Sequence, residues 1–130
     1  MPDKVEYWFN LAADDVPVAK LLLDGKKYLH AGFFCHLIVE KALKAMVASV
    51  TSEIPPKTHH LIKLSEQAGI FDDLSECQRN LLVELNPLNI EARYPEYKER
   101  IAKTLTPEMT TRLFKETESF LCWIKQKLEK

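Results

Sequence analysis

The segment His36-Leu37-Ile38-Val39-Glu40-Lys41-Ala42-Leu43-Lys44-Ala45 lies in the middle of the run Gly32–Val50, and this run decides the fold. At 100° per residue its apolar side chains cover nearly the whole circumference of a helix, which is typical of a helix at the centre of a bundle. The exception is one narrow stripe of ionisable residues, His36, Glu40 and Lys44, with Lys41 to one side. Because unpaired buried charges are very unfavourable, this stripe must pair internally, line a cleft or meet another chain.

Length and composition are those of one ordinary globular domain. The chain of 130 residues is 46% apolar and 28% charged, so we expect a single domain with one core over residues 1–130. The net charge of −1 gives no overall attraction to nucleic acid. The N-terminus does not resemble a signal peptide and no apolar run approaches about 20 residues, so a cytoplasmic location without membrane association is expected.

The three cysteines, Cys35, Cys77 and Cys122, are far apart in the chain. Their spacing supports neither a zinc site nor a redox motif, and no metal or cofactor is expected. Each cysteine occupies an apolar position of a helical pattern. The pattern therefore predicts three reduced thiols in the core of a cytosolic protein.

The first half of the chain predicts two long helices and one short one. The long helices are Asp3–Asp24 and Lys27–Val50, with Gly25 as the C-terminal cap of the first. Pro17 is expected to kink or reset that first helix near Val16. After a loop with two prolines, Thr58 is the expected N-cap of a helix over His59–Ala68.

The second half predicts two more helices with a long connection between them. Ser75 and Gln78 form a capping-box pattern that opens a helix at Glu76–Leu85. In the connection, Pro95 favours an extended Arg93-Tyr94, and Tyr97–Lys103 is a candidate helical turn. Thr106 caps a last helix that has Pro107 at its first position. The fold class is therefore all-α, an up-and-down bundle of four to five helices with a long structured crossover before the C-terminal helix.

The stripe on the central helix is the first candidate site. Glu40 and Lys44 have the favoured spacing for an ion pair within one helix, and His36 stands four residues before Glu40. A charge-paired stripe that seals the bundle edge or a dimer seam is one interpretation. A polar cleft in which Lys41 or Lys44 meets a phosphate or a partner carboxylate is the other. A metal site from His36 and Glu40 lacks the rest of a ligand set.

Two further groups are candidates for binding an anion. His59 and His60 are placed in the first turn of a helix, where free amides favour anions; the alternative is that both are neutral, hydrogen-bonded structural residues. Arg93 and Tyr94, close to Tyr97, could grip a phosphate and stack on a base, or could fasten the crossover to the bundle. Nucleophilic catalysis has little support, because no Gly-x-Ser-x-Gly elbow or phosphate-binding glycine loop occurs.

Over almost its whole length the chain resembles a small bacterial or archaeal HEPN-domain protein. The resemblance rests on residues in four successive segments: Trp8, Ala12, Asp15, Ala19 and Leu22; then Tyr28, Phe33, His36, Glu40, Lys41, Leu43 and Lys44; then Pro56-Lys57-Thr58-His59, Leu61 and Leu64; and last Asn86 and Ala92-Arg93-Tyr94-Pro95. Leu37 departs from the pattern, since members of this type often carry glutamine there. That change favours packing over a polar role at this one position.

The resemblance implies a bundle of four or five helices, usually a homodimer with a groove between protomers. It also implies one of two functions. Some members are metal-independent RNases with an arginine followed within a few residues by a histidine, and others are partners of small nucleotidyltransferases encoded beside them. In this chain every histidine precedes every arginine, so the RNase signature is absent.

The sequence therefore predicts a non-catalytic, homodimeric binding module that is the partner subunit of a small nucleotidyltransferase, as in a toxin–antitoxin pair, with nucleotide or RNA as a further ligand. The residues expected to bind the nucleotide or the partner are His36, Glu40, Lys41, Lys44, His59, Arg93 and Tyr94. The alternative is a metal-independent RNase. In that case His59 or His60 would be the general base and Arg93 would stabilise the phosphorane charge.

Overall fold

The computed structural model describes residues 2–51, 53–90 and 94–129 of the chain. In these ranges it is all-α, with no strand, which confirms the predicted fold class. The elements in chain order are α1 (Asp3–Asp24), α2 (Tyr28–Val50), α3 (Leu61–Gln67), η1 (Phe71–Asp73), α4 (Glu76–Leu85), η2 (Asn86–Leu88), α5 (Pro95–Thr104) and α6 (Pro107–Leu128). No described helix is long and apolar enough to cross a membrane.

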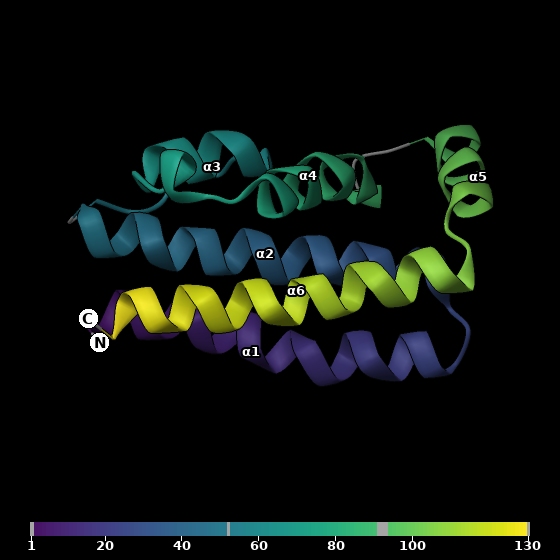
Figure 1. The fold of residues 1–130 in the computed structure, drawn as a ribbon, viewed down its shortest axis with the longest axis horizontal. Helices are drawn as coiled ribbons and strands as arrows, with labels where there is room; N and C mark the ends of the chain where they lie inside the picture. The colour runs from purple at the N-terminus through teal and green to yellow at the C-terminus, as the bar shows by residue number, and fades with distance from the viewer. Residues whose placement is uncertain (1, 52, 91–93, 130) are drawn as a thin grey trace.

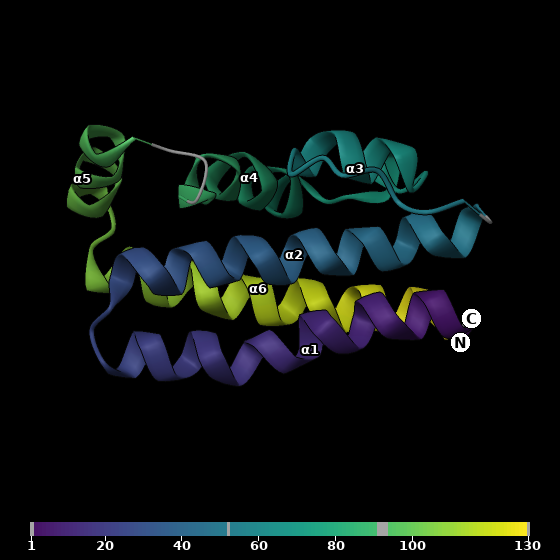
Figure 2. The same cartoon turned by 180° about the vertical axis from the view of Figure 1, so that it is seen from behind.

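The three long helices lie along one axis, α2 and α6 in the same direction and α1 in the opposite one, and the short helices complete the bundle (Figures 1 and 2). Figure 1 shows α1, α2 and α6 side by side, with α3 and α4 following one another as an interrupted rod on the far side of α2. Helix α5 stands across one end of the molecule, and the two termini meet at the other end (Figures 1 and 2). The described part of the crossover before the last helix thus consists mainly of α5.

Helix α2 is the centre of the core, as its all-round apolar sequence predicts. It packs against α1, α3, α4, α5 and α6, and 14 of its 23 residues are buried. Three of those 14 are the ionisable residues His36, Glu40 and Lys44. The stripe is buried because α2 lies at the centre of the bundle and the other helices pack around it.

Gly25 is the C-cap of α1, as predicted, and two of the predicted N-caps are confirmed. Ser75 and Gln78 form the complete capping box at the start of α4, and the Thr106 side chain accepts a hydrogen bond from the Met109 amide at the start of α6. Both caps satisfy amide groups that have no partner inside the helix, which is why these side chains mark helix starts. These local signals therefore predict where α4 and α6 begin.

The cap of the third helix was predicted wrongly. Helix α3 starts at Leu61, and its N-cap is His60, whose Nδ1 accepts from the Lys63 amide (3.3 Å). Thr58 instead accepts from the amide of His60 (3.1 Å), in a turn before the helix. His59 and His60 therefore precede the helix and do not lie in its first turn.

The structure differs from the sequence predictions at three other places. Helix α1 continues through Pro17 from Asp3 to Asp24, so the helix is not reset there, and the kink near Val16 stays a prediction. The crossover forms a full helix, α5, with Pro95 at its first position, where a missing amide hydrogen does no harm. Cys35 is buried, but Cys77 and Cys122 are exposed, so only one of the three predicted core thiols lies in the core.

Candidate functional site

The centre of the candidate site is the carboxylate of Glu40, in the middle of α2. Its Oε2 accepts a hydrogen bond from Nζ of Lys44 (3.1 Å), and its Oε1 accepts one from Nδ1 of His59 (2.9 Å). Nδ1 of His36 lies 3.7 Å from the same Oε1. The Glu40 side chain is only 6% exposed, so a cation and two imidazoles surround a buried negative charge. We call His36, Glu40, Lys44 and His59 the Glu40 cluster.

His36 ties the loop before α3 to the central helix. Its imidazole is fully buried, and Nε2 donates a hydrogen bond to the backbone carbonyl oxygen of His59 (3.1 Å). A carbonyl oxygen can only accept, so Nε2 carries the proton. The His59 residue is thus held twice, through its backbone by His36 and through its ring by Glu40. This double attachment explains how an exposed loop residue reaches a helix 19 positions earlier in the chain.

The Glu40 carboxylate also orients the ring of His59. Because a carboxylate oxygen accepts, Nδ1 of His59 carries the proton of that hydrogen bond, and Nε2 is left as an acceptor in the neutral ring. The His59 side chain is 58% exposed, whereas Glu40 is buried. Of the four members of the cluster, His59 is the one that solvent or a ligand can reach most easily.

Lys44 is the buried cation of the cluster, and its ammonium group interacts with Glu40 and with Trp8. Besides Glu40, its Nζ lies 5.2 Å from the centroid of the Trp8 ring of α1, within the range of a cation–π interaction. The Lys44 side chain is 8% exposed. These contacts fix the ammonium group between two helices, so it stabilises the junction of α1 and α2.

Lys41 faces a different partner, as its position beside the stripe predicts. Its Nζ donates to Oδ2 of Asp15 in α1 (2.7 Å), and the two side chains are 22% and 16% exposed. This ion pair and the contact of Lys44 with Trp8 both join α1 to α2. Sequence reasoning did not place Trp8 and Asp15 in the site. The signal that could have found them is their spacing of seven residues, which puts both on one face of α1.

The crossover residues do not join this cluster within the described chain. Tyr94 is the N-cap residue of α5 and is 82% exposed. Arg93 lies outside the described residues. His60 is exposed and caps α3. Of the predicted binding residues, the structure therefore brings together His36, Glu40, Lys44 and His59, with Lys41 beside them.

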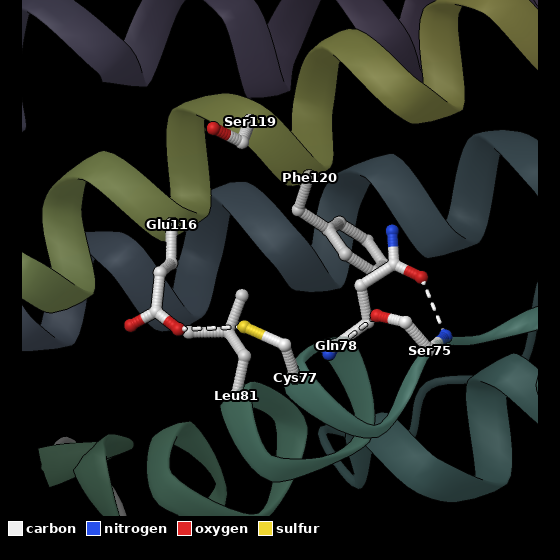
Figure 3. Close-up of a pocket in the computed structure, with 7 residues that line it drawn as sticks. All are labelled: Ser75, Cys77, Gln78, Leu81, Glu116, Ser119 and Phe120. Carbon is white, nitrogen blue, oxygen red and sulfur yellow. Dashed lines mark hydrogen bonds between the residues drawn. The ribbon is translucent and has the colours of Figure 1, made fainter.

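A second polar cluster lies between α4 and α6, and sequence reasoning missed it. It borders a cavity of about 200 Å³ that is drawn in Figure 3. The lining residues are Ser75, Cys77, Gln78, Leu81, Glu116, Ser119 and Phe120. In Figure 3 the sulfur of Cys77 points to the carboxylate of Glu116, and the thiol donates to Oε1 of Glu116 (3.2 Å).

Arg112 completes this second cluster. It donates through Nη1 to Glu116 Oε2 and through Nη2 to Glu84 Oε2, both at 2.6 Å, so it bridges α6 and α4. The hydrogen bonds to Glu84 and then to Glu116 raise the pKa of Arg112 above its usual value. The Glu116 carboxylate raises the pKa of the Cys77 thiol, mainly through their hydrogen bond. We call Cys77, Glu84, Arg112 and Glu116 the Glu116 cluster.

The chemistry available to the two clusters is limited. A raised thiol pKa makes Cys77 a poor nucleophile near neutral pH, because the thiolate is the reactive form. Among the described residues, no group of three or more His, Cys, Asp or Glu side chains is arranged to hold a metal ion. The oriented imidazole of His59 is the one group of the Glu40 cluster that combines exposure with a defined direction.

Comparison with known proteins identifies one family. The model of the HEPN domain matches residues 5–128, nearly the whole chain, and the match includes every described residue of both clusters. No curated protein and no solved structure matches the chain.

Proposed function

We propose that this chain, which belongs to the HEPN domain family, is a non-catalytic binding subunit: a homodimer that pairs with a small nucleotidyltransferase and accepts a nucleotide or RNA phosphate beside His59. The proposal combines the family membership with the internal geometry of the Glu40 cluster. Within it, Glu40, Lys44 and His36 hold the fold together, and His59 and Lys41 are the residues that a ligand can reach.

The observation that carries the proposal is the satisfaction of Glu40 by groups of its own chain. Both of its carboxylate oxygens accept hydrogen bonds, and the acidic, basic and imidazole groups around it are buried except for His59. A general acid or base must reach the proton that it transfers, and Glu40 and Lys44 are shielded from substrate in this arrangement. Their chemistry supports the role of a structural centre under a binding surface.

The order of residues in the sequence supports the same conclusion. No histidine follows an arginine anywhere in the chain, so the Arg-then-His pair of the RNases in this family has no counterpart within one segment. An RNase site would require residues from separate segments.

Purification of the tagged protein from its native cells tests the partnership. We expect a small nucleotidyltransferase to co-elute in stoichiometric amount and to be identified by mass spectrometry. Lys41→Ala and His59→Ala should reduce its recovery, whereas Arg112→Ala, at the Glu116 cluster, should not. Recovery of the protein without any nucleotidyltransferase would reject this part of the proposal.

Nucleotide binding is tested separately, by the shift in melting temperature that each nucleoside triphosphate causes in wild type and in His59→Ala.

One observation favours the alternative, a metal-independent RNase. The hydrogen bond from His59 Nδ1 to the buried Glu40 carboxylate orients the ring as the base of many hydrolases is oriented, with the other nitrogen available. Incubation of the protein at micromolar concentration with labelled RNA in EDTA tests this function. The binding-subunit proposal expects no cleavage. Cleavage that disappears in His59→Ala but persists in His60→Ala would establish the RNase instead.

A further inference from the structure

The outer face of α1 carries apolar side chains that no described element covers. Tyr7 is 60% exposed, Val18 38% and Leu21 72%, and Leu11 between them is half-buried. The core face of the same helix is made by Val5, Phe9, Ala12 and Ala19. In Figures 1 and 2 the side of α1 that faces away from α2 and α6 is open. Exposed apolar side chains gathered on one helix face mark an interaction surface more often than scattered ones do.

The spacing of these residues is that of a coiled-coil seam. Tyr7, Leu11, Asp14, Val18 and Leu21 follow one another at intervals of 4, 3, 4 and 3 residues. Repeats of this kind place side chains on one stripe, where they can interdigitate with those of a second helix. At 100° per residue the stripe lies nearly opposite the core face of α1. Tyr7, Val18 and Leu21 are therefore exposed although α1 is packed in the bundle. We call these five residues the α1 seam.

The charge on α1 decides what kind of helix fits the seam. Asp14 is its central member, it is exposed, and it forms no ion pair within the parts of the chain that the structure describes. The whole helix has five acidic residues, Asp3, Glu6, Asp14, Asp15 and Asp24, against two lysines. A partner helix with apolar seam positions and a basic residue at its centre would complement both features.

A second copy of this chain fits the seam poorly. The neighbouring seam positions are 3 residues before and 4 residues after Asp14, so an antiparallel pair of α1 helices would set each Asp14 opposite Leu11 or Val18 of the other copy. Each carboxylate would then be buried against an apolar side chain without a counter-charge, which is unfavourable. A parallel pair in register would place the two Asp14 carboxylates against each other. A shift by one heptad would separate the carboxylates but would leave fewer of the apolar positions paired. Like charges at facing positions of a seam are destabilising and select against that pairing.

We propose that the α1 seam is the docking surface for an amphipathic helix of another protein, one that presents a lysine or arginine to Asp14. The inference rests on the proposed function in one respect, since it gives the partner subunit a second contact surface, in addition to the one at Lys41 and His59. The homodimer of the proposed function then forms through another face. Asp14 sets the register and the choice of partner, and the apolar members of the seam supply the contact area.

A charge-swap experiment with designed peptides tests this docking surface. The probes are two labelled helical peptides with leucine at the seam positions and either lysine or glutamate at the central position, and binding is followed by fluorescence anisotropy. We expect the lysine peptide to bind the wild type at least about tenfold more tightly than the glutamate peptide. Asp14→Lys should reverse that preference. Leu21→Glu should abolish binding, and the matched control Val83→Glu, at an exposed valine of α4 (57%), should not.

The outcomes separate this inference from the proposed function. Absence of binding by both peptides, or binding that ignores the charge at position 14, would reject the seam. A dimer in sedimentation velocity that becomes monomeric in Leu21→Glu would assign the seam to a second copy and also overturn it. Failure to recover a nucleotidyltransferase, with the peptide preference intact, would reject the proposed partner and leave the seam supported. Unchanged melting temperatures of the variants show that each result reflects binding.

Discussion

The Glu40 and Glu116 clusters have the same local design and differ in burial. Each has a carboxylate paired with a cation four residues away on the same helix, Lys44 for Glu40 and Arg112 for Glu116. Each carboxylate also accepts a hydrogen bond from a distant segment, from His59 in the first case and from Cys77 in the second. The cation of the first cluster is 8% exposed and that of the second 47%. Because the pairing pattern is the same in both clusters, we expect their difference in burial to make the Glu40 cluster contribute more to the free energy of unfolding than the Glu116 cluster.

Glu40→Gln should have the largest effect on stability. The substitution keeps the shape of the side chain but leaves the buried Lys44 without its counter-charge, and breaking a buried ion pair typically lowers the free energy of unfolding by about 3–5 kcal/mol. Urea unfolding followed by circular dichroism measures the change. Glu116→Gln, the matched substitution at the exposed cluster, should lower it by less than about 1 kcal/mol. Equal losses of unfolding free energy in Glu40→Gln and Glu116→Gln would show that burial does not make the Glu40 cluster more important for stability.

A paired substitution sharpens this result. Replacement of both partners by apolar residues, Glu40→Leu with Lys44→Met, removes the charges that would otherwise be buried without a partner. We expect the double variant to recover much of the stability lost in Glu40→Gln, since apolar replacements of buried ion pairs are often neutral or stabilising. A double variant less stable than Glu40→Gln would show that the charges themselves are required for packing.

The free energy of unfolding should depend on pH through Cys35, whose thiol is buried, whereas the thiol of Cys77 in the Glu116 cluster is exposed. Burial raises the pKa of the Cys35 thiol from 9.0 to about 11, although a hydrogen bond with Thr117 opposes the shift. Because the folded state disfavours the Cys35 thiolate, the protonated thiol contributes to the free energy of unfolding. That contribution is complete below pH 9 and is lost as the pH rises to about 11. The loss should reach about 2–3 kcal/mol. Urea unfolding of wild type and Cys35→Ala across this range should show a steeper decline for the wild type, and parallel curves would contradict the assignment.

Arg112→Ala should have a small effect on stability. The side chain bridges Glu84 and Glu116 in solvent, where each exposed ion pair contributes about 1 kcal/mol or less. We expect a decrease of about 0.5–1 kcal/mol in the free energy of unfolding, reduced further by high salt. A decrease of several kcal/mol, insensitive to salt, would place this cluster in the same class as the Glu40 cluster.

The reactivity of Cys77 should give the smallest change. The hydrogen bond to Glu116 is the main reason that its thiol pKa is raised, so Glu116→Gln should speed its alkylation near pH 8 by a few-fold. Glu84→Gln is the control, because Glu84 makes the smallest contribution to that shift. Mass spectrometry of the iodoacetamide-labelled protein distinguishes Cys77 from the buried Cys35. Identical rates for wild type and Glu116→Gln would remove Glu116 as the cause.

The sequence predicted the candidate site in part. Periodicity alone placed His36, Glu40 and Lys44 on one stripe of α2 and set Lys41 apart, and the structure confirms this arrangement. It did not reveal that His59 meets Glu40 or that Asp15 meets Lys41, because those residues are 19 and 26 positions apart in the chain. The binding roles of these residues, and those of Arg93 and Tyr94, stay predictions.

Apart from the start of α3 and the length of α5, the pattern of residues along the chain predicted the helices, the caps at Ser75 and Thr106, and the identity of the central helix. Each of these depends on hydrogen bonds or periodicity that reach only about four residues along the chain. Which polar groups are buried, and what they contact, depends on the packing of whole helices, as the exposure of Cys77 and the contact of Glu40 with His59 illustrate. A residue's neighbours along one helix are fixed by its geometry, but its neighbours across the bundle are fixed by the packing of the entire core.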